Sequence, residues 1–318
     1  MQSFLDFEKP VAELQGKILE LEKLADTDQA VEIDEELARL RTRAEEALAD
    51  IYSKLTPWQK TQVARHPLRP HFADYVANLI TEWTPLAGDR KFAEDAALLA
   101  GFGRFNGQPV AVMGTERGAT TKARIMHNFG SARPEGYRKA VRIMDMADRF
   151  DIPVLAFVDT AGAYPGIGAE ERGQAEAIAR STDKCLELGV PNLAIIVGEG
   201  GSGGAIAIAT ANRVLMLQNA IYSVISPEGG ASILWRDAGK AREAANAMKI
   251  TAQDLIGFGV VDSMIAEPPG GAHRHVEAVM ADTGAEIKNF LADFSAMSRD
   301  EIREHRRQKF LSIGDSLL

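Results

Sequence analysis

Five glycines lie within seven residues of the stretch LAIIVGEGGSGGAIAIATA, residues 193–211, between an apolar run and an Ala/Ile-rich run. The first run predicts a buried strand and the second predicts a helix. Glycine N–H groups can approach a ligand closely, and the first N–H groups of a helix lie at its positive end. The stretch therefore predicts a binding site for an oxygen that carries or develops negative charge. Tight packing of the glycines without a ligand is the alternative.

Neither of two nucleotide-binding motifs is satisfied in full at this position. Residues 198–203 satisfy G-x-G-x-x-G, but dinucleotide-binding folds need a following strand that ends near an acidic residue. Here the next strand, 213–217, is followed by Gln218 and Asn219, so NAD binding is not predicted. A P-loop is excluded because Gly-Lys-Ser/Thr occurs nowhere in the chain.

Residues 200–204 also satisfy G-x-S-x-G, the nucleophile elbow of serine hydrolases, with Ser202 as the nucleophile. A hydrolase needs an acid and then a histidine downstream, and the candidates are Asp237 or Asp262 and His273 or His275. The other interpretation is an oxyanion hole of consecutive glycine N–H groups, which needs no nucleophilic side chain. The spacing alone leaves both open.

A second Gly-rich stretch, DTAGAYPGIG at 159–168, follows an apolar strand at 154–158. Ligands in α/β sheets bind beyond the carboxyl ends of strands, so the two Gly-rich stretches are predicted to share one pocket. Tyr164 could present a hydroxyl or a stacking face there, or pack on the surface. Glu170 and Glu171 could act as acid and base, although acidic residues in a first helical turn usually serve the helix dipole.

Composition limits the remaining classes. The chain has 318 residues, of which 46% are hydrophobic, and includes a single cysteine, Cys185. One cysteine excludes a disulfide framework and a cysteine-based zinc site, and the six histidines lack metal-ligand spacing. No run of 18 apolar residues and no signal peptide is visible, so a cytoplasmic protein without a membrane partner is expected.

The net charge of −9 is unevenly distributed. Residues 1–50 contain 14 acidic and 6 basic side chains, whereas the rest of the chain is nearly neutral. Nucleic acid is therefore not an expected partner. One basic cluster stands out at 117–142 and would suit a phosphate or an acidic partner, or be a solvated helix face. It comprises Arg117, Lys122, Arg124, Arg133, Arg138, Lys139 and Arg142.

The periodicity of apolar residues predicts an α/β protein with a helical arm. Amphipathic helices are expected near 11–24 and 33–51, separated at Thr27 and Asp28. An Asn106-Gly107 pair predicts a hairpin turn between two strands at the start of the core. The predicted divisions are an arm at 1–55, a Pro- and Trp-rich connecting segment at 56–97, a core at 98–275 and a helical extension at 276–318.

Within the core, strands and helices alternate. The strands are expected at 154–158, 193–197, 214–217, 222–225 and 260–265, and the helices at 171–188, 203–211 and 230–248.

Several long motifs together resemble one family, the α subunit of the carboxyltransferase of bacterial acetyl-CoA carboxylase. The similarity runs over nearly the whole chain, from FLDFEKP at 4–10 to the basic tail. It rests on GEGGSGGA at 198–205, DTAGAYPGIGAEERGQ at 159–174, YSVISPEGGASILW at 222–235, NFGSARPEGYRKA at 128–140 and EPPGGAHR at 267–274.

The resemblance implies a crotonase-like (ClpP/crotonase) fold of repeated ββα units and an α2β2 assembly. The β partner would carry a zinc ribbon, so no metal is expected in this chain. The implied reaction transfers the carboxyl group of N1′-carboxybiotin, held on a biotin carboxyl carrier protein, to acetyl-CoA. The product, malonyl-CoA, feeds fatty acid synthesis, and biotin carboxylase completes the full complex.

The resemblance also implies site residues. The N–H groups of Gly203 and Gly204 would stabilise the ureido oxyanion of biotin, while the β subunit would serve the thioester oxyanion. Residues that form the two Gly-rich turns would also contact biotin or substrate. These are Gly200, Gly201, Ser202, Gly162, Ala163 and Tyr164.

Two positions depart from the family pattern. Ala161 replaces a proline that is usual in the first Gly-rich turn, and Thr115 replaces a common histidine. Neither affects the glycine N–H groups. Gly204→Pro is expected to abolish transfer without loss of assembly, and Ser202→Ala to be mild unless the protein is a hydrolase. A non-catalytic scaffold subunit of the same complex is the third hypothesis.

Overall fold

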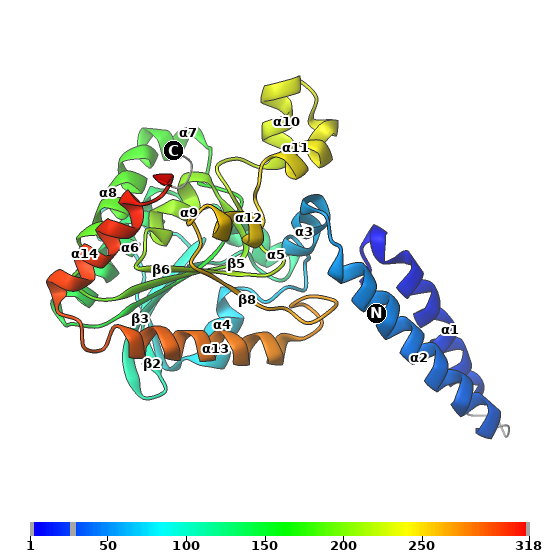
Figure 1. Ribbon diagram of the computed structural model, residues 1–318. Coiled ribbons are helices and arrows are strands. Elements are labelled where there is room, and N and C mark those ends of the chain that lie inside the picture. Colours follow the sequence, from blue (N-terminus) through cyan, green and yellow to red (C-terminus); the bar gives the residue numbers. More distant parts are fainter. Residues whose placement is uncertain (1–2, 26–29, 316–318) are drawn as a thin grey trace.

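The computed structural model describes residues 3–25 and 30–315, and the expected break at Thr27 and Asp28 lies outside them. One mixed eight-stranded sheet forms the centre of the molecule, and helices cover both of its faces (Figure 1). The strand order is β1-β2-β3-β4-β5-β6-β8, and β7 pairs with β5 beyond the end of β6. The α/β class expected from the sequence is therefore confirmed.

The first three strands are antiparallel and the others are parallel. Asn106 and Gly107 both adopt positive φ, 48° and 82°, as a two-residue hairpin turn requires. β4 and β5 are buried at every position, which is typical of parallel strands covered by helices on both faces. The strands are β1 (Thr81–Pro85), β2 (Leu98–Phe105), β3 (Gln108–Thr115), β4 (Val154–Thr160), β5 (Asn192–Gly201), β6 (Arg213–Leu217), β7 (Ile221–Ser223) and β8 (Ser263–Ile265).

Two groups of helices sandwich this sheet. α6 (Pro134–Arg149), α8 (Gln174–Glu187), α9 (Ser202–Ala209) and α14 (Arg299–Leu311) lie on one face. On the other face lie α4 (Phe72–Leu79) and α13 (Val276–Asp293), which contact each other. The largest apolar cluster fills the space between these layers and the sheet. It includes side chains of β4 and β5, so both strands are packed into the core.

The N-terminal arm is a helical hairpin that projects from the body (Figure 1). It consists of α1 (Lys9–Ala25) and α2 (Ala30–Ser53), preceded by the 3₁₀ turn η1 (Asp6–Glu8). Ile18, Leu37 and Leu40 form a small apolar core between the helices. The base of the arm is tied to the body by the buried carboxylate of Glu8, which accepts hydrogen bonds from Tyr52 and Arg274.

Residues 56–97, expected to be a connection, contain α3 (Pro57–Ala64) and α4 but also supply a strand of the sheet. β1 pairs antiparallel with β2 at the sheet edge. Residues 81–85 show no alternating pattern because β1 is largely exposed on both faces, and Pro85 is tolerated at an edge.

Three other expectations differ in detail. The helix expected at 171–188 is split into α7 (Ile167–Glu171) and α8 because Gly173 adopts a left-handed conformation, φ 79°. The helix expected at 230–248 is α10 (Pro227–Trp235), the turn η3 (Ala238–Lys240) and α11 (Ala241–Ala247). The strand expected at 260–265 is shorter and follows α12 (Ala252–Gly257).

Candidate active site

The turn between β5 and α9 places the glycines predicted to carry the chemistry. β5 ends at Gly201, and α9 begins at Ser202, whose φ of 52° is a left-handed conformation that non-glycine residues rarely adopt. The N–H groups of Ser202, Gly203 and Gly204 belong to the first turn of α9 and have no acceptor within the helix. These donors lie at the positive end of the helix dipole, as an oxyanion site requires.

The second Gly-rich stretch packs directly against this turn. A Cβ at Gly204 would lie 2.7 Å from the carbonyl carbon of Gly162 and 2.8 Å from the nitrogen of Ala163. A Cβ at Gly201 would collide with the carbonyl oxygen of Ala161. The structure therefore brings the two Gly-rich stretches together by backbone contact, which only glycine permits at 201 and 204.

Gly203 differs from its neighbours in this respect. A Cβ there would meet Ile178 of α8 at 3.4 and 3.5 Å, which is ordinary to slightly tight contact. Its φ is not in the left-handed region. Packing alone therefore does not require glycine at this position.

Tyr164 is half-buried and folded back over the loop. The Arg133 guanidinium lies 4.6 Å from its ring centroid, and its backbone N–H donates to the Ala132 carbonyl at 3.0 Å. Gln174 donates to the carbonyls of both Ala132 and Tyr164. One ring face of Tyr164 is thus occupied by Arg133, and the loop is anchored to α6 and α8.

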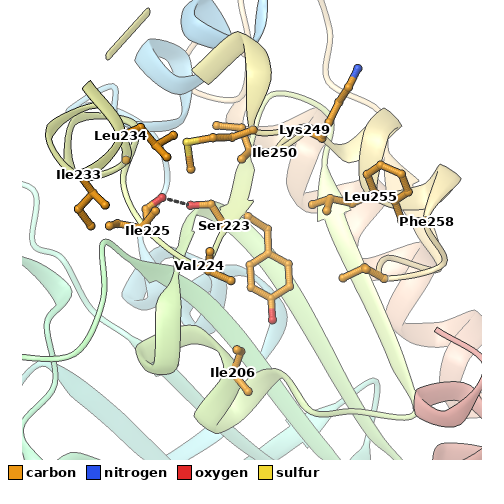
Figure 2. A pocket seen from close by; sticks show the side chains of 14 residues that line it. Ile206, Ser223, Val224, Ile225, Ile233, Leu234, Lys249, Ile250, Leu255 and Phe258 are labelled. Atoms are coloured by element: carbon orange, nitrogen blue, oxygen red, sulfur yellow. Dashed lines mark hydrogen bonds between the residues drawn. The ribbon is translucent and has the colours of Figure 1, made fainter. Parts of the chain in front are cut away.

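An apolar cavity of about 560 Å³ adjoins the glycine turn. Ile206, one turn after Gly203 in α9, lines it together with Tyr222, whose ring would lie 2.9 Å from a Cβ at Gly200. Figure 2 shows Ile233 and Leu234 of α10 across the cavity from Leu255 and Phe258. The Lys249 ammonium points away from it (Figure 2). Burial raises the pKa of Tyr222 to about 12, so its phenol stays neutral.

A second, polar cavity of about 330 Å³ lies at the carboxyl ends of β4 and β5. Asp159 and Glu199, which line it, are buried and paired with Arg65 and Arg117. The sequence assigned no role to Arg65, Asp159 or Glu199, and it indicated Arg117 only as part of the basic cluster at 117–142. The available signal for the two carboxylates was an acidic residue within two positions of the end of each buried apolar run.

The acids and histidines expected of a serine hydrolase have other partners. Asp262 precedes β8 and accepts from the Val214 N–H at 2.6 Å, at the amino ends of the parallel strands, whereas Ser202 follows the carboxyl end of β5. Asp237 caps η3, and the His275 Nε2 lies 2.9 Å from the Pro269 carbonyl. The His273 ring stacks on His66 at 3.8 Å, and burial with nearby His66 and Arg274 lowers the pKa of His273 to about 3.

Most of the basic cluster at 117–142 serves internal contacts. Arg117 pairs with Glu199, Lys139 with Glu94, Arg138 with Asp89, and Arg142 donates to the Ala87 carbonyl. Lys122 is exposed, whereas Arg124 donates to the Gly118 carbonyl and Arg133 covers Tyr164. Glu170 and Glu171 are exposed in α7.

Three further observations concern residues 3–25 and 30–315. No group of three or more His, Cys, Asp or Glu side chains in these ranges is arranged to hold a metal ion. No helix within them combines the length and apolar character needed to cross a membrane. Cys185 is a buried free thiol.

Comparison with known proteins places the chain in one family. Residues 4–314 match the family described as acetyl co-enzyme A carboxylase carboxyltransferase-like. The acetyl-coenzyme A carboxylase carboxyl transferase subunit alpha of Nitrobacter winogradskyi is 68% identical over 317 residues, covering 100% of this chain and 98% of the relative. The protein of the same name from Methylobacterium nodulans is 66% identical and is covered completely, as is this chain.

Solved structures are similar at lower identity. Transcarboxylase 12S, solved with methylmalonyl-coenzyme A and methylmalonic acid, superposes with a TM-score of 0.59 at 20% identity. The match covers 74% of this chain and 44% of that one. The Pseudomonas malonate decarboxylase MdcD-MdcE hetero-dimer gives a TM-score of 0.53 at 18% identity, covering 70% and 89%. These likenesses confirm the expected crotonase-like fold.

Proposed function

This chain belongs to the family of acetyl-CoA carboxylase carboxyltransferase alpha subunits, and we propose that its Gly203 and Gly204 N–H groups stabilise the ureido oxyanion of biotin during carboxyl transfer. The substrates are N1′-carboxybiotin on a carrier protein and acetyl-CoA, and the product is malonyl-CoA for fatty acid synthesis. The enzyme is a transferase.

The chemistry requires two sites for negative charge. Breaking the C–N bond of carboxybiotin releases CO2 and leaves the electron pair delocalised onto the ureido oxygen. The basic biotin then takes a methyl proton from acetyl-CoA, and the resulting thioester enolate forms the new C–C bond with CO2. Fixed N–H donors stabilise such oxyanions without reorganisation, and losing one typically costs about 3–4 kcal/mol of transition-state stabilisation.

The observation that carries the proposal is the first turn of α9. Its N–H groups have no acceptor within the helix, and backbone contact with residues 161–163 fixes their direction. The adjoining apolar cavity gives the site a low-dielectric wall, which strengthens hydrogen bonds to a charged oxygen. Gly200, Gly201, Ser202, Gly162, Ala163 and Tyr164 form the surrounding turns and contact biotin or substrate.

We further propose that this chain supplies half of the site in an α2β2 complex. A β subunit with its own zinc ribbon would provide the donors for the thioester oxyanion, and the biotin carboxyl carrier protein and biotin carboxylase would complete the complex. The relatives are named as subunits, which supports a partner chain. The buried free thiol of Cys185 suits the cytoplasm, where thiols stay reduced.

The structure suggests a cleaner test than Gly204→Pro. Any Cβ at 204 meets the 162–163 backbone, so that variant changes packing as well as the donor. At Gly203, Ala and Pro both add a Cβ into available space, and Pro in addition removes the N–H and restricts the backbone of Ser202. In the assembled α2β2 complex, Gly203→Ala should keep carboxyl transfer within about threefold, and Gly203→Pro should lower kcat about 100-fold or more.

Activity is measured as malonyl-CoA formation by α alone, β alone and the mixture, with assembly checked by gel filtration. We expect only the mixture to be active. Equal activity of the two Gly203 variants in intact complexes would contradict the oxyanion role and favour a scaffold subunit.

A further inference from the structure

Five charged or titratable side chains form a buried cluster at the carboxyl ends of β4 and β5. They are Arg65 at the end of α3, His71 before α4, Arg117 after β3, Asp159 in β4 and Glu199 in β5. The side chains of Asp159 and Glu199 are each 4% exposed, and that of Arg117 is 14% exposed. The two acids lie against two arginines, and Arg65, whose side chain is 28% exposed, also pairs with Glu228 of α10 at 2.7 Å.

Each carboxylate is held from more than one direction. Arg65 donates to Glu199 with its Nη2 at 2.6 Å and its Nε at 3.1 Å, and Arg117 Nη2 donates to the same carboxylate at 3.1 Å. Arg117 Nε lies 3.6 Å from Asp159 Oδ1, and His71 Nδ1 lies 3.6 Å from Asp159 Oδ2. A bidentate arginine contact fixes the orientation of a carboxylate as well as its position.

The two acids are also tied to each other through the backbone. Asp159 Oδ1 accepts from the Glu199 N–H at 3.0 Å, and the Asp159 N–H donates to Thr115 Oγ1 at 2.7 Å. A Cβ at Gly198 would lie 2.5 Å from Asp159 Oδ1, so the glycine lets β5 approach this carboxylate. The cluster thus crosslinks β3, β4 and β5 at the edge where the Gly-rich turns begin.

The two carboxylates of the cluster lie close in the sequence to the Gly-rich turns, one of which carries the N–H donors. Asp159 is two residues before Ala161, and Glu199 is two residues before Gly201. The backbones of Ala161 and Gly201 are in contact. α9 and its N–H groups begin at the next residue, Ser202. A shift of either carboxylate would therefore move one side of that contact relative to the other.

Buried ion pairs are a poor way to gain stability, because removing charges from water costs about as much as their attraction returns. The ion pairs buried at the carboxyl ends of β4 and β5 therefore suggest a role in positioning nearby groups. We propose that Arg65 and Arg117 are positioning residues for carboxyl transfer: by fixing Glu199 and Asp159, they set the direction of the Gly203 and Gly204 N–H groups. This inference rests on the proposed function of those two donors.

The test uses the α2β2 complex with Arg117→Gln and, separately, Glu199→Gln. Displacing an oxyanion donor by a fraction of an ångström weakens an interaction made mainly in the transition state. We expect kcat to fall at least tenfold with KM for acetyl-CoA within about twofold. Because both residues act through one network, the double variant should lose no more than about as much as the worse single variant. Arg117→Lys, which keeps the charge, should recover part of kcat.

Arg306 of α14, which contacts the amino end of β5, provides a matched control. It is a fully buried arginine that donates to Asn192 and Asn212 and to the carbonyls of residues 186, 188 and 190, at the opposite end of β5. Arg306→Gln should lower the melting temperature at least as much as Arg117→Gln. It should nevertheless leave kcat per assembled complex within about twofold.

Two results would overturn the proposal while leaving the proposed function intact. One is an active wild-type complex in which Arg117→Gln and Glu199→Gln both keep wild-type kcat. The other is a loss of kcat in Arg306→Gln equal to that in Arg117→Gln, which would mean that stability alone is involved. A wild-type complex without carboxyl transfer would overturn the proposed function itself, and this inference with it.

Discussion

Gly204 in α9 faces Gly162 across a backbone contact in which a Cβ at Gly204 would lie 2.7 Å from the Gly162 carbonyl carbon. The two residues are 42 positions apart in the sequence and join the ends of two neighbouring parallel strands, β4 and β5. This contact fixes the first turn of α9 and determines which substitutions the turn can accept.

Gly204→Ala is expected to separate the two turns, because the added methyl group meets backbone atoms that cannot rotate away. Overpacking of this kind typically costs about 1–3 kcal/mol of folding free energy. We expect a lower melting temperature and at least a tenfold loss of carboxyl transfer. Gly203→Ala is the control, since its methyl group has room beside Ile178. Equal melting temperatures of the two variants would contradict the close contact.

Ser202 tests the remaining hydrolase hypothesis and the strain of the turn at once. Its φ of 52° costs a non-glycine residue about 1 kcal/mol, which glycine does not incur. Ser202→Gly should therefore keep or slightly raise the melting temperature, whereas Ser202→Ala should be neutral or mildly destabilising. Both variants should retain carboxyl transfer within about threefold, as measured by malonyl-CoA formation. Loss of all activity in both variants would favour a serine nucleophile.

Removing Arg117 should change how stability depends on pH. Burial alone would raise the pKa of Asp159, but Arg117 and the neighbouring His71 and Glu199 N–H lower it from 3.8 to about 2. A carboxylate with a lowered pKa stabilises the fold above its ordinary pKa, and this contribution disappears as the pH falls toward 2. The shift corresponds to about 2 kcal/mol.

The measurement is urea unfolding of wild type and Arg117→Gln between pH 7 and pH 3. The difference in unfolding free energy should be largest near neutral pH and should shrink as the pH falls through 3.8 toward 2, because the unfolded chain then gains a proton at Asp159 before the folded wild type does. Arg104→Gln is the control, since its pair with Glu82 is 43% and 70% exposed and contributes little. A difference that stays constant with pH would show that the Arg117 pairs do not supply the stability.

Much of the local structure could be predicted from the sequence. The strand, glycine turn and helix at 193–211 correspond to β5 and α9, and the two arm helices correspond to α1 and α2. These predictions succeed because hydrophobic periodicity and the Asn106-Gly107 turn act over a few residues. Family membership also followed from the sequence, because long motifs specify it without reference to contacts.

The contacts that give the candidate site its geometry were decided by the tertiary structure. Arg65 and Glu199 are 134 residues apart, and nothing in the connecting segment around Arg65 predicts that its guanidinium reaches the end of β5. For the basic cluster at 117–142 the sequence left open a surface for an anion or acidic partner and a solvated helix face, but Arg117 and Lys139 are used in internal pairs. Charge pairing depends on distances in space, which local patterns do not contain.

Within the glycine-rich motif too, some properties followed from the sequence and others only from the tertiary structure. The sequence by itself established that five glycines follow a buried strand and precede a helix, and hence that N–H donors for an oxyanion could lie there. Only the tertiary structure distinguished Gly201 and Gly204 from Gly203. Positions 201 and 204 must be glycine because backbone from residues 161–163 touches them, whereas position 203 has room for a side chain. The reason is steric: a missing Cβ is visible in the sequence, but the atoms that would collide with it come from another part of the chain.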